Sequence, residues 1–252
     1  MSARGDCEGD AIVLAGATGR VGAATLTTLV REGARVVVLS RDEARARATI
    51  SEALEPALRD HASALRADLS LPADADRAVA FAVEKFGRVD AVVNLAGSGV
   101  GWGPISESTL GELHASVQAF LDTAYTLTMA ALRTMLAQPY REAALSRGRI
   151  VTVTAGSSKQ PAEGRALFGA VKSAVNTLML GVARDHKADG IVANALVLGG
   201  VAFEGAEKFY SPEDFRAAAT PQEVAEVLTF LAANRSSGIN GALVDLNARE
   251  ID

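Results

Sequence analysis

Short apolar runs and longer amphipathic stretches alternate along the whole chain. Runs such as Ile12-Val13-Leu14 are uniformly apolar, which is typical of strands buried on both faces of a parallel sheet. This pattern predicts seven strands, at residues 11–15, 35–40, 64–67, 91–94, 149–154, 192–197 and 242–245. The segments between them are long enough for crossover helices, so each strand can connect to a parallel neighbour.

Three of the intervening segments carry helix signals. Apolar residues recur every three or four positions over residues 110–136 and 168–184, which predicts two long amphipathic helices. Thr220-Pro221-Gln222-Glu223 is a capping box with proline at the first helical position. The alternation predicts an α/β fold: a single-domain, doubly wound, Rossmann-type parallel sheet of about seven strands with helices on both faces. We expect this domain over residues 11–252, after a flexible tail at residues 1–10.

Composition narrows the range of partners. Hydrophobic residues make up 49% and charged residues 22% of the 252, as in an ordinary globular protein. The formal net charge of −5 argues against a nucleic-acid or anionic-membrane partner. Cys7 is the single cysteine, and we find neither a signal peptide nor an apolar run near the ~20 residues that span a bilayer. We therefore expect a cytoplasmic protein with a small-molecule substrate.

A glycine-rich turn follows the first strand and opens a helix. Strand, glycine turn and helix together are the arrangement that holds a pyrophosphate, because the glycines let the backbone approach and the helix N-terminus offers free N–H groups. Glycine also serves any turn that needs positive φ, but here it stands in the context that dinucleotide binding requires. The predicted cofactor-binding residues of this turn are Gly16, Thr18, Gly19, Arg20, Val21 and Gly22.

The end of the second strand indicates which dinucleotide binds. In a dinucleotide fold this point faces the adenosine ribose, where an acid binds the 2′-OH of NAD and an arginine accommodates the 2′-phosphate of NADP. The chain has Ser40 and Arg41 there and no acid at the strand end, and Arg20 offers a second positive charge. Arg41 could instead be a solvated first-turn residue of the helix at 42–55. We predict NADP(H) as the cofactor.

Two further strand ends carry candidate cofactor contacts. Asp68, followed by Leu69, closes the third strand, where its carboxylate could accept from the adenine amino group or cap the next helix. Asn94, Ala96 and Gly97 close the fourth strand, and small residues there leave room for a flat ring, although they are also common in loops.

These motifs together resemble the short-chain dehydrogenase/reductase family, over residues 11 to 246. The Gly16–Gly22 turn resembles the glycine motif of the family's extended and atypical members. Val93-Asn94-Leu95-Ala96-Gly97 is similar to the family's Asn-Asn-Ala-Gly, with Leu95 in place of the second Asn. The resemblance implies that Lys172 contacts the nicotinamide ribose and that Gly199 belongs to the loop after the sixth strand.

The resemblance fails at the residues that carry the family's chemistry. There, a tyrosine gives a proton to the carbonyl oxygen as hydride arrives, a lysine lowers its pKa, and a serine holds the oxygen. Lys172 is the remnant of the Tyr-x-x-x-Lys motif and the one catalytic residue that we carry over. The other family positions have become apolar: the tyrosine is Phe168, the serine Ala155, the helix asparagine Phe120 (with Gln118 the nearest polar alternative), and the threonine near the nicotinamide Phe203.

Three interpretations follow from these losses. The first is a ketoreductase for a bulky, apolar, polyketide-like carbonyl, in which an aromatic or polycyclic ketone bonded to its own hydroxyl supplies the acid. Trp102 could stack on such a ring or only anchor its loop. The second is a non-redox enzyme, such as an isomerase, dehydratase or pericyclic catalyst, because one fold hosts many chemistries. The third is a non-catalytic NADP-binding sensor or partner protein. The retained Lys172 favours the first.

Other features complete the expectation. A water or another side chain is the alternative to the tyrosine as proton donor, and the polar candidates are Ser157, Ser158, Lys159, Tyr210 and His114. The segment 199–214 resembles the family's substrate lid. The two long apolar helices resemble the family's dimer faces, so we expect a homodimer or homotetramer. No metal site is predicted.

Overall fold

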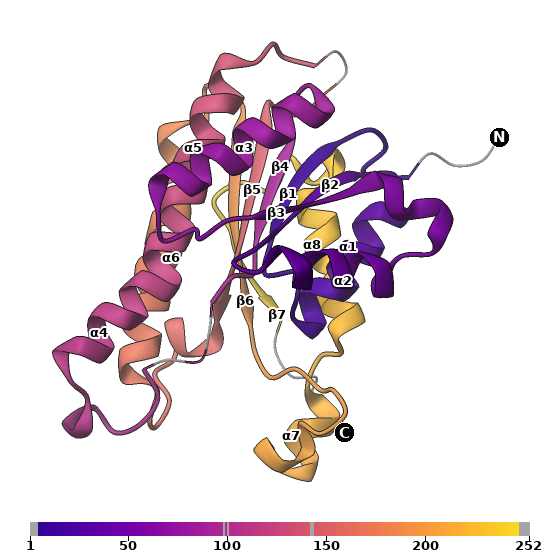
Figure 1. Ribbon diagram of the computed structural model, residues 1–252. Helices are drawn as coiled ribbons and strands as arrows, with labels where there is room; N and C mark the ends of the chain where they lie inside the picture. Colours follow the sequence, from indigo (N-terminus) through magenta and orange to yellow (C-terminus); the bar gives the residue numbers. More distant parts are fainter. Residues whose placement is uncertain (1–4, 98, 100, 142–143, 247–252) are drawn as a thin grey trace.

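The computed structural model describes residues 5–97, 99, 101–141 and 144–246 (Figure 1). The strands are β1 Ala11–Ala15, β2 Arg35–Ser40, β3 Ala62–Arg66, β4 Ala91–Asn94, β5 Gly148–Ala155, β6 Ile191–Leu198 and β7 Leu243–Leu246. The α-helices are α1 Arg20–Arg31, α2 Glu43–Ala53, α3 Pro72–Phe86, α4 Leu110–Ser116, α5 Thr123–Ala137, α6 Ala166–Asp185, α7 Pro212–Ala217 and α8 Pro221–Ala232.

All seven strands form one parallel sheet in the order β3-β2-β1-β4-β5-β6-β7. The predicted fold class and the strand count are confirmed. The third strand starts earlier than predicted, because its pairing with β2 begins where Ala62 lies opposite Val36. Chain order reverses between β1 and β4, and the carboxyl ends of these neighbours form the crevice where ligands bind in such sheets.

Helices cover both faces of the sheet (Figure 1). Alternate residues of each buried strand point to opposite faces: Val13 and Ala15 pack toward α3, α5 and α6, whereas Ile12 and Leu14 pack toward α1, α2 and α8. Both sets are fully buried, which accounts for the uniformly apolar run seen in the sequence.

The helix predicted over residues 110–136 is not continuous. A π-helical turn, Val117–Asp122, separates α4 from α5, and the Thr123 hydroxyl donates to the carbonyls of Ala119 and Phe120 within it. The extra residue in the turn changes the helical phase, so Phe120 is buried while Leu110 is 67% exposed. π-turns of this kind are frequent at functional sites.

The N-terminal segment is packed rather than flexible from Gly5 onward, which corrects the predicted tail; residues 1–4 lie outside the described part. Cys7 is fully buried, and burial raises the pKa of its thiol to about 12. Asp10 pairs with buried Arg149 at 2.6 Å and with Arg141 at 2.7 Å. Burial nevertheless raises the pKa of Asp10, because desolvation outweighs the two guanidinium groups.

One helix, α6, is long and apolar enough to cross a membrane by length and composition alone. Half of its apolar window is buried inside the fold, chiefly against β5 and β6. A core helix of a soluble protein passes the same test, so this helix is weak evidence for a membrane.

Candidate active site

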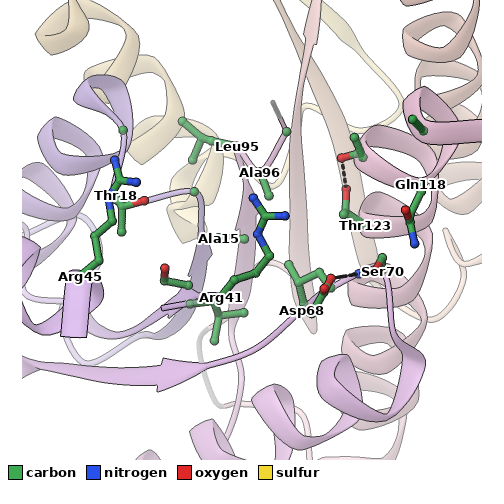
Figure 2. A pocket seen from close by; sticks show the side chains of 18 residues that line it. Ala15, Thr18, Arg41, Arg45, Asp68, Ser70, Leu95, Ala96, Gln118 and Thr123 are labelled. Carbon is green, nitrogen blue, oxygen red and sulfur yellow. Dashed lines mark hydrogen bonds between the residues drawn. The ribbon is translucent and has the colours of Figure 1, made fainter. Parts of the chain in front are cut away.

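A cavity of about 650 Å³ lies at the carboxyl edge of the sheet, at the β1–β4 reversal (Figure 2). Residues from the ends of β1, β2 and β4, from the loop after β3 and from the α4–α5 region surround it. Of the predicted cofactor contacts, those that line it are Gly16, Thr18, Gly19, Ser40, Arg41, Asp68, Leu69, Ala96 and Gly97. Gln118, the polar alternative to Phe120, lines it as well.

The glycine turn has the shape that a pyrophosphate requires. Gly16 has φ +84°, and a Cβ there would lie 2.7 Å from the carbonyl carbon of Leu95. A Cβ on Gly22 would lie 2.1 Å from the Gly16 oxygen, so glycine lets α1 pack directly under the turn. Gly19, the N-cap of α1, offers no side-chain acceptor to the first N–H groups of the helix. Gly16, Thr18 and Gly19 of this turn line a cavity wide enough for a dinucleotide, and the residues present therefore fit the cofactor.

Two arginines line the end of the cavity next to β2. Arg41 follows the strand and Arg45 lies one helical turn later, and Figure 2 shows both side chains directed into the cavity. Asp42, the nearby acid, is the N-cap of α2 and accepts from the backbone N–H of Arg45 at 3.2 Å. The Asp42 carboxylate thus caps α2 and is not among the groups that line the cavity.

Asp68 lies in the cavity wall, but it does not cap the next helix. Its Oδ1 accepts from the backbone N–H and the hydroxyl of Ser70, whereas the N-cap of α3 is Leu71. The backbone N–H of Asp68 donates to the Asp74 carboxylate. This hydrogen bond, together with one from the Arg77 side chain, lowers the pKa of Asp74. Of the two roles considered for Asp68, the geometry leaves the cavity-facing one.

Six predicted cofactor contacts do not line this cavity: Arg20, Val21, Gly22, Asn94, Lys172 and Gly199. Gly22 supports the turn from beneath, and Asn94 shapes the loop by accepting from the Ala96 N–H at 2.9 Å. The Arg20 guanidinium lies 4.2 Å from the ring centroid of Phe203, and its predicted contact with the cofactor stays a prediction. The Gly199 N–H donates to Leu246.

The positions that resemble the family's catalytic residues come together next to the cavity. The rings of Phe120 and Phe168 meet edge to face with centroids 5.2 Å apart, and the Phe120 ring packs against Gly97. Ala155 ends β5 one residue before a 3-10 turn, Gly156–Ser158. Phenylalanine and alanine side chains donate no hydrogen bond, so none of these three positions can supply a proton.

Lys172 is a buried cation inside this apolar group. Its Nζ donates to the Val153 carbonyl at 3.0 Å and lies 4.4 Å from the Phe120 ring centroid and 5.9 Å from that of Phe168. Burial lowers the pKa of Lys172 to about 8. A group that titrates this close to neutrality can exchange a proton under physiological conditions.

Comparison with known proteins identifies the family. The family profile described as short chain dehydrogenase matches residues 10–214. The chain belongs to the short-chain dehydrogenase/reductase family. This short-chain dehydrogenase/reductase is 30% identical to an A-factor type gamma-butyrolactone 1′-reductase of Streptomyces virginiae, over 91% of each chain. It is 28% identical to a 2,3-dihydroxy-2,3-dihydro-p-cumate dehydrogenase of Pseudomonas putida, over 95% of this chain and 93% of the other.

Solved structures show the same fold. A short-chain dehydrogenase/reductase from Brucella melitensis superposes with a TM-score of 0.81 at 24% identity, covering 95% of this chain and 96% of that chain. ElxO with NADP bound has a TM-score of 0.84 at 21% identity, covering 94% and 96%. A tyrosine-to-phenylalanine variant of ElxO, solved with NADPH bound, matches to the same degree. The family and its named dehydrogenases and reductases make this chain an oxidoreductase with a nicotinamide cofactor.

The polar side chains considered as substitute proton donors are already engaged or lie on the surface of this short-chain dehydrogenase/reductase. The Ser158 hydroxyl donates to Ala155 and accepts from Asn176, and Lys159 pairs with Asp245 at 2.6 Å. The Tyr210 hydroxyl accepts from the Val201 N–H, and His114 is exposed on α4. Ser157 is partly exposed and has no hydrogen bond from its hydroxyl among the described residues.

Three polar side chains that line the cavity were not predicted from the sequence: Arg45, Ser70 and Thr123. Arg45 had a usable signal, because it lies four residues after Arg41 on a helix that Asp42 caps. Ser70 and Thr123 had none, since each depends on the path of a loop or on the π-turn.

Proposed function

We propose that this chain is an NADP(H)-dependent ketoreductase for a bulky, apolar, polyketide-like carbonyl, working without the family's tyrosine and serine. The observation that carries the proposal is that the polar cavity and the Phe120–Phe168 pair lie next to each other. The polar cavity has Arg41 and Arg45 at one end and extends to Ala96 and Gly97. The Phe120 ring contacts Gly97 and packs against the Phe168 ring. A cofactor-binding site thus adjoins an apolar region that can contact a substrate.

The cofactor assignment rests on charge. Arg41 and Arg45 can both bond a 2′-phosphate, and Ser40 adds a hydroxyl in the same wall. When bound, NADPH supplies a hydride. The ElxO variant with NADPH bound shows that one protein of this fold keeps the cofactor after a tyrosine becomes phenylalanine. Lys172 is the residue present to contact the nicotinamide ribose.

The proton requirement limits the class of substrate. Phe120, Phe168 and Ala155 provide packing area and no donor, so the substrate carbonyl needs an acid of its own. A ketone next to a phenolic hydroxyl on an aromatic ring carries one, and its flat ring suits an aromatic wall. The protein then contributes positioning, which alone can supply several kcal/mol.

The test is NADPH consumption against matched aromatic ketones with and without a neighbouring hydroxyl, with the product mass measured. We expect reduction, a mass gain of two hydrogens, only for the hydroxylated member. Tight NADPH binding without consumption by any ketone would instead favour the sensor or partner protein. A product of unchanged mass, or one that has lost water, formed without NADPH consumption would favour the isomerase, dehydratase or pericyclic enzyme. We expect the protein in the cytoplasm.

A further inference from the structure

A continuous stack of side chains leads from the apolar part of the site to the surface. Trp102 meets Phe168 edge to face, with centroids 6.5 Å apart, and Phe168 meets Phe120 in the same way. On the outer side, the guanidinium of Arg165 lies 3.6 Å from the Trp102 ring centroid. A backbone hydrogen bond of 2.8 Å between Gly103 and Gly164 joins the two loops that carry Trp102 and Arg165. The stack is therefore a built feature and not a chance contact.

Arg165 is held against the ring but has its hydrogen-bonding capacity unused. Across the described ranges 5–97, 99, 101–141 and 144–246, no carboxylate pairs with it and no oxygen accepts from its guanidinium. An arginine stacked on an aromatic face keeps its N–H edge free, and that edge fits a planar carboxylate in a bidentate way. Arg165 is only half-buried, so a ligand can reach the edge from solvent.

Trp102 shows the complementary feature. It is 58% exposed, an unusual state for the largest side chain of the molecule beside a site. Its contact with Phe168 places it next to the position that corresponds to the family's tyrosine. A flat aromatic ligand that packs on Trp102 would thus have its ring near the reaction site and one edge at Arg165.

We propose that Trp102 and Arg165 form a subsite for an aromatic carboxylate, so that the substrate is an anionic aromatic ketone rather than a neutral one. The ring packs against Trp102 and the carboxylate bonds to the Arg165 guanidinium. This inference rests on the proposed ketoreductase function for the identity of the ligand as substrate. Binding of the carboxylate itself does not require turnover.

The experiment compares two inert probes of nearly the same size and shape, one anionic and one neutral. Naphthalene-2-carboxylate and naphthalene-2-carboxamide are titrated into the full-length protein with saturating NADP⁺, by calorimetry. We expect the carboxylate to bind about tenfold or more tightly than the amide, as one charge-assisted bidentate contact implies. Arg165→Gln should abolish this preference and leave the affinity for the amide unchanged, and Arg165→Lys should retain part of it.

Two further variants locate the effect. Trp102→Ala should weaken both probes to a similar degree, because it removes the ring contact and not the charge. Arg184→Gln, at the other end of α6, should change neither. Since Trp102 is the single tryptophan of the chain, quenching of its fluorescence by either probe reports binding at this place.

Equal affinity of the parent protein for the two probes, or a carboxylate preference that survives Arg165→Gln, would overturn the inference. Such a result would leave Arg165 as a support for the Trp102 loop. Failure of the proposed function is separate: it would appear as an absence of NADPH consumption, whatever the probes show.

Discussion

At the scale of single residues, Lys172 is a buried cation without a carboxylate beside it among the described residues. The family lysine normally has a tyrosine beside it, whereas here its neighbours are two phenylalanine rings and one carbonyl oxygen. A ring face stabilises a cation, but less well than water does, and burial lowers the pKa of Lys172 to about 8. The folded protein therefore holds a charge at neutral pH at the expense of stability.

Replacing Lys172 by methionine should stabilise the cofactor-free protein at neutral pH by about 2 kcal/mol. The variant no longer has the buried charge that the lowered pKa reflects, but it loses the hydrogen bond to the Val153 carbonyl. The unfolded chain keeps the proton up to pH 10.5 while the folded chain releases it near 8, so unfolding takes up a proton in this window. The parent's stability should thus rise with pH from about 8 to 10.5 relative to the variant. Urea unfolding at several pH values measures this, with exposed Lys187→Met as control. A destabilised Lys172→Met variant at neutral pH would contradict it.

Restoring the missing hydroxyls tests whether their loss alone prevents the reduction of simple ketones. Phe168→Tyr with Ala155→Ser places an acid and an oxyanion donor at the family positions, beside a lysine that is already there. We expect turnover of simple ketones by NADPH to rise by about 10²–10⁴-fold, the usual contribution of positioned proton transfer. The assay is the initial rate on a ketone without a neighbouring hydroxyl, and the control is Phe81→Tyr, on α3 and outside the cavity lining. An unchanged rate would mean that Phe120 also blocks the ordinary chemistry.

Residue identities, but not their contacts, were predictable from the sequence. The spacing from the fifth strand located Ala155, Phe168 and Lys172, and the structure places Lys172 beside the Phe168 ring and bonds it to Val153, two residues before Ala155. The partner of Arg20 was not predictable, because Phe203 lies far away in the sequence, in the loop after β6.

At the scale of elements, the proposed preference for NADP(H) depends on the junction of β2 and α2. Arg41 ends the strand segment and Arg45 lies in the first turns of the helix, so a single local geometry presents both charges. Removing both by Arg41→Ala with Arg45→Ala should equalise the affinities for NADPH and NADH, and either single change should reduce the preference about tenfold. Fluorescence titration of both cofactors measures it. Arg47→Ala, on the same helix but paired with Glu43, should leave the preference intact. A parent protein that binds both cofactors equally would refute the NADP assignment.

The segment from Gly5 to Asp10 is a second element whose role follows from its contacts. Asp10→Ala leaves Arg149, which is 2% exposed, without its closest carboxylate, and unpairing a buried charge destabilises a protein by about 3–5 kcal/mol. Thermal or urea unfolding should show this loss, and alkylation of buried Cys7 should become faster as the segment opens. The control is Asp6→Ala, whose partner Arg235 is largely exposed, with an expected change below about 1 kcal/mol. Equal effects of the two variants would argue against a structural role for Asp10.

Periodicity predicted the elements well where one face is buried and poorly where it is not. The seven strands and the long α6 helix follow from apolar spacing, and the start of α8 follows from the capping box at Thr220. The packed N-terminal segment was missed because its polar composition is that of a tail, and its burial depends on Arg149, which is far away in the sequence. The π-turn was missed because an extra residue in one helical turn leaves no mark in an apolar pattern.

At the scale of the whole molecule, the outer surface of α5 and α6 remains to be accounted for. The apolar window of α6 is only half buried within the chain, and Tyr125 and Leu136 of α5 are 51% and 37% exposed. Ala170 and Ala174 leave the exposed side of α6 smooth enough for close approach of another helix. Apolar area of this kind on neighbouring helices is typical of an interface between copies of one chain.

We therefore expect a homodimer or homotetramer in which α5 and α6 of one protomer pack on those of another. Ala174→Glu should lower the mass measured by light scattering at micromolar concentration, because it puts an unpaired charge into an apolar interface. Ala57→Glu, on the 3-10 helix before β3, adds the same charge at an exposed position outside these helices and should leave the mass unchanged. The α6 helix also carries Phe168 and Lys172, and Phe120 lies in the π-turn that precedes α5, so dissociation should weaken NADPH binding as well. A monomeric parent protein at this concentration would refute the arrangement.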